Sequence, residues 1–113
     1  KFVDAVPLAH KDFLTNLFTC YTEGDYYFVH AGIKPGVALD RQSERDQLWI
    51  RRRFHLSDDD HGAVIVHGHE IVSRVVVEHN RIGIDTGASE SGRLSCLVLE
   101  EDRRRILQTG SEW

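Results

Sequence analysis

The sequence predicts a mixed α+β domain spanning residues 1–113, and three observations favour this fold class. The length of 113 residues allows one domain with a modest core, and 41% apolar with 28% charged residues is ordinary for a globular protein. Two segments carry helical patterns, and several short runs are rich in β-branched or aromatic residues. Helices followed by a group of strands indicate helical layers packed on a mixed sheet.

Residues 7–19 are predicted to form the first helix. Pro7 suits its first turn, where a backbone amide would have no partner in any case. A turn over residues 23–25 then leads into a strand over residues 26–29. The residues that recur with the helical period, and so would share one face of the helix, are His10, Phe13, Leu14, Leu17 and Phe18.

Residues 44–54 are predicted to form a second, shorter helix. Its acids lie at the N-terminal end and its arginines at the C-terminal end, as the helix dipole prefers. The polar loop over residues 57–62 contains three consecutive aspartates, which we interpret as a solvated turn because the glycine and distant glutamate of a calcium loop are missing. The strands expected after this loop cover residues 64–66, 72–78, 81–85, 94–99 and 105–108.

Composition narrows the choice of partner and location. The net charge of −4 gives no reason to expect nucleic acid, and the arginines at 51–53 and 103–105 are flanked by acids and interpreted mainly as solvated. We expect no membrane association, because no apolar run is long enough for a span and no signal peptide opens the chain. Two unpaired cysteines, Cys20 and Cys96, favour a reducing, cytoplasmic setting. A start at Lys1 with no methionine indicates a processed, excised or shortened product.

Two predicted strands end in histidine and glycine, and these ends are the leading candidates for a functional site. The first carries His30 and Gly32; the second carries His67, Gly68 and His69, with Gly68 expected to allow a sharp exit from the strand. Neutral imidazole is a ligand for zinc, manganese or iron. His67 shares a strand face with His69, so it remains open as a second ligand or as a buried partner of the strand. The histidines interpreted as surface residues are His10, His55, His61 and His79.

Four runs carry a resemblance to a known family. They are Gly24-Asp-Tyr-Tyr-Phe-Val-His-Ala-Gly-Ile33, Leu48-Trp-Ile-Arg51, Val64-Ile-Val-His-Gly-His69 and Arg81-Ile-Gly-Ile-Asp-Thr-Gly-Ala88. In order and spacing they are similar to the later part of a bacterial calcineurin-like metallophosphoesterase. The likeness is to the serine/threonine protein phosphatase branch, which also includes the diadenosine tetraphosphatases, and it covers nearly the whole chain.

The resemblance implies a fold, a pair of metal ions and a set of residues. The family fold is a four-layer α/β/β/α sandwich, of which this chain would be the C-terminal half. The family site holds two divalent ions, here manganese, iron or zinc, which bind a phosphate ester and activate a water for attack on phosphorus. His30 and His69 match family ligands of one metal. Arg51 matches a phosphate-binding arginine, whose planar fork can hold two phosphate oxygens.

The chain departs from the family pattern in two ways. Glu70 and Ile71 stand where the family usually has threonine and often proline, which would put a carboxylate near the site. The family motifs Asp-x-His, Gly-Asp-x-x-Asp-Arg-Gly and Gly-Asn-His-Glu do not occur in these 113 residues. They supply the bridging aspartate, the ligands of the other metal and the general acid. We therefore assign no catalytic residue to this chain and expect it to be inactive alone.

The resemblance favours a serine/threonine phosphoprotein phosphatase as the parent enzyme. Hydrolysis of diadenosine polyphosphates remains open, because pocket shape outside the motifs decides the substrate. A catalytically inactive fragment or a module that binds a partner through its exposed sheet also remains open. Without the missing half, the strands would present apolar faces or unpaired edges, so we expect a homo-oligomer, a domain swap or poor solubility.

The motifs also predict how the candidate site residues are arranged in space. His30 and His69 should converge with nitrogens close enough to share one ion, because loops after parallel strands meet at the same edge of a sheet. His67 should point elsewhere, and Arg51 should face the same cleft with room for a phosphate. Two imidazoles are too few for a stable site, so the isolated chain is expected to be metal-free or to recruit Glu70 or a partner chain.

Overall fold

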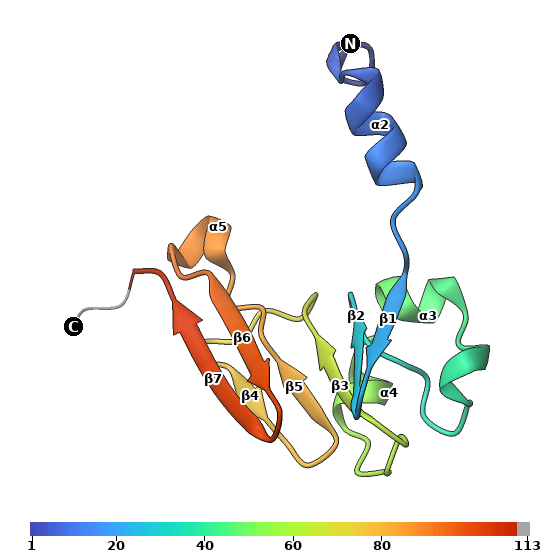
Figure 1. The fold of residues 1–113 in the computed structure, drawn as a ribbon, viewed down its shortest axis with the longest axis vertical. Helices are drawn as coiled ribbons and strands as arrows, with labels where there is room; N and C mark the ends of the chain where they lie inside the picture. Colours follow the sequence, from blue (N-terminus) through green and yellow to red (C-terminus); the bar gives the residue numbers. More distant parts are fainter. Residues whose placement is uncertain (111–113) are drawn as a thin grey trace.

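A mixed five-stranded sheet, sheet A, lies at the centre of the structure, a computed structural model that describes residues 1–110 (Figure 1). Its order is β1-β2-β3-β5-β4; β2, β3 and β5 run parallel, and both edge strands are antiparallel to their neighbours. β6 and β7 form a second sheet, sheet B. The strands are β1 (Cys20–Glu23), β2 (Tyr26–Val29), β3 (Val64–His67), β4 (Val76–Val77), β5 (Arg81–Gly83), β6 (Ser95–Glu100) and β7 (Arg103–Gln108).

The helices are short, and the predicted α+β class is confirmed for the described residues. Residues 111–113 of the predicted domain lie outside the residues that the structure describes. Over residues 1–110, no helix is both long and apolar enough to cross a membrane. The helices are α1 (Phe2–Ala5), α2 (Leu8–Thr15), the 3-10 helix η1 (Leu39–Arg41), α3 (Glu44–Trp49), α4 (Arg52–His55) and α5 (Ala88–Ser91).

One face of sheet A, the covered face, packs against α4 and the loop after β2 and holds the core. Tyr27 of β2 and Ile65 of β3 are register partners, and both are buried with Ile33 and Phe54 in one cluster. The buried Gln47 amide of α3 donates to the Tyr27 hydroxyl at 2.8 Å. Because polar groups at this depth need partners, this bond fixes α3 against the sheet.

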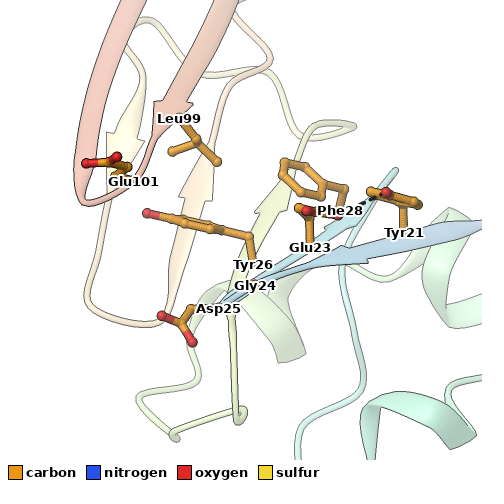
Figure 2. A pocket seen from close by; sticks show the side chains of 8 residues that line it. All are labelled: Tyr21, Glu23, Gly24, Asp25, Tyr26, Phe28, Leu99 and Glu101. Carbon is orange, nitrogen blue, oxygen red and sulfur yellow. Dashed lines mark hydrogen bonds between the residues drawn. The ribbon is translucent and has the colours of Figure 1, made fainter.

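The opposite face of sheet A, the open face, is uncovered over β1 and β2. Tyr21, Tyr26 and Phe28 lie on it, since they alternate along their strands with residues that enter the core. These three rings and Leu99 of β6 line a hollow of about 660 Å³ between the two sheets (Figure 2). Arg104 of β7 connects sheet B to sheet A at this hollow, because its Nε donates a hydrogen bond to the Tyr26 hydroxyl at 2.8 Å.

Residues 1–19, here called the arm, project away from both sheets (Figure 1). Neither α1 nor α2 contains a buried residue. The helix predicted over residues 7–19 ends at Thr15, so that part of the prediction was wrong. The Asn16 side chain caps the helix by donating to the Asp12 carbonyl at 2.8 Å, and the chain then extends into β1. β1 was not predicted; it forms because it pairs antiparallel with β2 across the turn at Gly24, whose φ is +53°.

The second predicted helix, over residues 44–54, is interrupted. α3 begins with Ser43, whose hydroxyl accepts from the Asp46 amide, and ends where Ile50 turns extended (φ −60°, ψ 146°). Arg51 follows with φ −130° and ψ −113°, and α4 begins directly after it. The break lets Ile50 pack against the core while Phe54 enters it from α4. Arg51 therefore lies between two short helices rather than at the end of one.

The expected segments after residue 71 differ from the structure in their bounds or in their conformation. The segment expected to be extended over residues 72–78 contributes only β4, and the strand expected over residues 81–85 ends at Gly83. A single helical turn, α5, occupies part of the loop expected around residues 86–92. The two final strands are each present with shifted ends and pair as an antiparallel hairpin.

Candidate metal and phosphate site

The two candidate histidines meet at one edge of sheet A. β2 and β3 are parallel neighbours, so the loops after them leave on the same side, and the Gly68 amide donates to the His30 carbonyl at 2.8 Å. His30 Nε2 lies 3.2 Å from His69 Nδ1, with the ring centroids 5.0 Å apart and edge-on. The predicted convergence of His30 and His69 is thus confirmed as geometry; their role as ligands stays a prediction.

The backbone that aims His69 differs from the sequence expectation. Gly68 does not adopt a positive φ, and a Cβ there would make only ordinary contacts, so it is not the residue that turns the chain. His69 itself has a φ of +67°, a conformation uncommon for a residue with a side chain. The turn is closed by the Glu70 amide, which donates to the Gly68 carbonyl at 2.8 Å. Strained backbone of this kind is concentrated at functional sites.

Unlike Gly68, Gly32 occupies a position where a side chain would not fit. Its φ is +153°, and a Cβ at this position would lie 2.3 Å from a ring carbon of Phe54. The loop that carries His30 therefore passes directly over the core. Because Phe54 is fully buried, the loop that carries the first histidine packs directly on the core.

The surroundings of His69 favour its neutral form. Burial lowers the pKa of His69, and Arg51 and His30 lower it further, while Glu70 and Asp85 act in the opposite direction. Its Nε2 is buried and has no hydrogen-bond partner among the described residues. A neutral imidazole keeps a lone pair for a ligand, which is the form that metal binding requires.

The distance between the two histidine nitrogens suits one metal ion, but two protein ligands are too few for a stable site. Two imidazole nitrogens on a tetrahedral zinc, with bonds of about 2.0–2.1 Å, lie roughly 3.3 Å apart, and His30 Nε2 and His69 Nδ1 are 3.2 Å apart. The described residues contain no group of three or more His, Cys, Asp or Glu side chains placed to hold a metal. Asp85 is close, but its carboxylate accepts from the Gly87 amide at 3.0 Å within its own turn. Further ligands would have to come from outside the described residues.

Arg51 lies beside the histidines without facing the expected cleft. Its Nη1 is 3.5 Å from Oε2 of Glu70, and the guanidinium is largely exposed. Arg51 does not line the hollow of about 340 Å³ that borders His30 and His69, so the expectation of a shared cleft was wrong in that respect. The same Oε2 of Glu70 also lies 4.0 Å from Nδ1 of His55. The carboxylate occupies the anion-binding side of Arg51.

His67 points to the covered face, as expected. It is 3% exposed, its Nδ1 lies 3.3 Å from the Gly68 carbonyl, and its Nε2 lies 3.2 Å from Nη1 of Arg81. A neutral ring with the proton on Nδ1 satisfies both contacts. Burial lowers the pKa of His67 to about 4, helped by Arg81 and His55 and opposed by the Gly68 carbonyl. His67 is therefore a structural residue of the core.

Two histidines interpreted as surface residues, His55 and His61, are half-buried and pack against this core, which corrects that prediction. The ring of His55 stacks on His67 with centroids 5.3 Å apart, and His61 packs on Phe54 at 5.8 Å. Burial lowers the pKa of both His55 and His61. His55 directly follows Phe54 in the sequence, and that adjacency to a large aromatic is the only pattern that could have indicated its burial.

Comparisons with known proteins do not assign a family. No family model matches the chain, and no curated protein matches it significantly. A family relationship therefore rests on the four motifs and on the geometry of the site.

Proposed function

We propose that the chain is the C-terminal half of a calcineurin-like metallophosphoesterase and contributes to metal-dependent hydrolysis of a phosphoester. A serine/threonine phosphoprotein is the favoured substrate class, and a diadenosine polyphosphate is the alternative. The observation that carries the proposal is the 3.2 Å approach of His30 Nε2 to His69 Nδ1 from two parallel strands. Two imidazole ligands of one ion have this separation, and in the absence of an ion it is also that of an N–H···N hydrogen bond between the two rings.

In this proposal the residues of the chain hold and orient rather than catalyse. His30 and His69 would ligate one of two metal ions through the two nitrogens that face each other. When bound, the ions would supply positive charge for the phosphate and acidify a water. Arg51 would hold phosphate oxygens through its planar guanidinium, after exchanging its present contact with Glu70. Bridging ligands and a general acid would come from residues outside this chain.

A catalytically inactive binding module is the second candidate, and a specific observation favours it. Among the described residues only two side chains are placed to hold the ion, whereas a stable zinc site normally has three or four protein ligands. Both candidates assume the same structure for this chain. They differ in whether residues outside the chain supply the remaining metal ligands. The coding sequence upstream of Lys1 separates them, because the phosphatase reading requires the Asp-x-His and Asn-His-Glu motifs there.

The proposal is tested by metal binding and by turnover. We expect the chain to bind Mn²⁺ or Zn²⁺ weakly in calorimetry, and His30→Ala or His69→Ala to abolish this binding. His67→Gln is the matched control and should leave metal binding unchanged, because His67 faces the core. The chain alone should not hydrolyse p-nitrophenyl phosphate or a phosphopeptide with added Mn²⁺, since half of a constellation does not give half the rate. Equal metal binding by the His69→Ala variant would refute the site.

A further inference from the structure

The arm is stabilised by little packing in the position it occupies. α2 is eight residues long and buries none of them. Isolated helices shorter than about 12–15 residues are marginal in water, so an eight-residue helix needs a packing partner. The apolar side chains of the arm are nevertheless exposed, with Phe18 at 86%. Within α2 itself, Leu8, Phe13 and Leu14 are each at least 60% exposed, so the arm presents apolar surface that is free to pack on another.

The open face of sheet A presents such a surface. A hollow of about 660 Å³ lies on it beside sheet B, and a second hollow of about 710 Å³ beside the arm shares Tyr21 and Phe28 with the first. The second hollow also reaches Val29, which packs against the core, and Glu44 and Leu48 of α3. The second hollow is lined by Leu14, Leu17 and Phe18 of the arm as well as by the sheet. An occupant of this space would therefore contact the arm and the sheet at once.

The exposed surface has the size of an interface. A folded monomer of 12.9 kDa exposes about 6,300 Å², whereas this chain exposes 8540 Å². The radius of gyration of 15.5 Å exceeds the roughly 13 Å expected for a compact domain of this length. The excess of roughly 2,000 Å² per copy would give a dimer interface within the range of obligate homodimers, about 2,000–5,000 Å² in total.

We propose that the chain forms a two-fold dimer in which the arm of each copy docks on the open face of the other. Both complementary surfaces are present on one chain, so a reciprocal exchange covers both arms and both faces and leaves no further site for growth. The arm of the second copy would enter between the first copy's arm and its sheet, the space lined by Leu14, Phe18 and Phe28. The hollow beside the arm also borders His30, so the docked arm would lie next to the candidate metal site.

The test is the mass of the chain in solution. Analytical ultracentrifugation should give twice 12.9 kDa for the wild-type chain, and the double variant L14E/F18E should give a monomer. Both side chains are largely exposed in a single copy, so the variant should retain the circular dichroism of the sheet. Leu56→Glu is the matched control: Leu56 is equally exposed but lies after α4, away from arm and open face, and the variant should remain dimeric.

A second measurement distinguishes exchange from other arrangements. In a sample mixed from isotopically labelled and unlabelled chains, isotope-filtered NOEs should connect Phe18 of one copy to Phe28 or Tyr21 of the other. A wild-type monomer, NOEs only within one copy, or a dimer unaffected by L14E/F18E would each overturn the proposal.

Discussion

The two faces of sheet A carry similar residues but differ in how deeply these residues are buried. On the covered face, Tyr27, Ile65 and Phe54 are almost completely buried. On the open face, Tyr21 is 57% exposed, and the arm beside it exposes its phenylalanines and leucines. Residue type therefore does not separate the two regions. What separates them is that α4 and the loop after β2 pack closely on one face, whereas over β2 sheet B reaches the other face through Arg104 and leaves a hollow between the two sheets.

The candidate site lies where these two regions meet. The His67 ring lies on the covered face, with its Nε2 3.2 Å from Nη1 of Arg81, whereas His30 and His69 follow the ends of β2 and β3 at the edge of the sheet. The rigid side of the domain thus positions the site, and the uncovered side is where further ligands or a partner would approach. Among the described residues, no third His, Cys, Asp or Glu side chain joins His30 and His69 in a group that could hold a metal.

The largest difference between the two regions should appear on truncating a phenylalanine in each. Phe54→Ala removes a fully buried ring and should lower the free energy of unfolding by about 3–5 kcal/mol. Phe18→Ala, on the exposed arm, should change it by less than about 0.5 kcal/mol when measured at dilutions where the chain is monomeric. Urea unfolding followed by tryptophan fluorescence measures both. Equal losses would show that the arm packs on its own domain.

The covered face should also make the domain sensitive to acid. Because the pKa of His67 is lowered from 6.5 to about 4, the unfolded chain binds a proton between these values and the folded chain does not. Stability should therefore fall as the pH drops from about 6.5 towards 4, by about 3 kcal/mol for this residue. His67→Gln should flatten this dependence, with His55 and His61 leaving a smaller remainder in the same direction. An unchanged pH profile in the variant would contradict the buried, neutral assignment.

The smallest expected effect is a change in phosphate affinity, caused by a substitution on the exposed side of the site. Glu70 competes with phosphate for Arg51, and exposed ion pairs of this kind contribute about 0.2–1 kcal/mol. Glu70→Gln should therefore tighten binding of inorganic phosphate up to about fivefold, measured by titration of the Arg51 Nε–H resonance in the presence of Zn²⁺. Glu90→Gln, an exposed change on α5, is the control and should leave the affinity unchanged. Identical phosphate affinity in the Glu70 variant and the wild-type chain would show that Glu70 does not compete for the arginine.

The sequence by itself determined the local parts of this protein. The β-branched and aromatic runs fixed β2 and β3, and the positions of His30 and His69 directly after these strands indicated one shared site. Strand alternation placed His67 and Ile65 on the same face of β3. These features depend on neighbours within a few residues, so a linear pattern contains them.

Only the tertiary structure decided how these parts meet. The break at Ile50 and Arg51, the pairing of β1 and the burial of His55 all depend on residues distant in the chain. His67 and His69 are separated by two positions and would share a face in a continued strand, but the positive φ of His69 ends the strand and turns its ring towards His30. The open face remains apolar because burial depends on a layer that packs against it, and strand alternation specifies the side of a residue without specifying what covers that side.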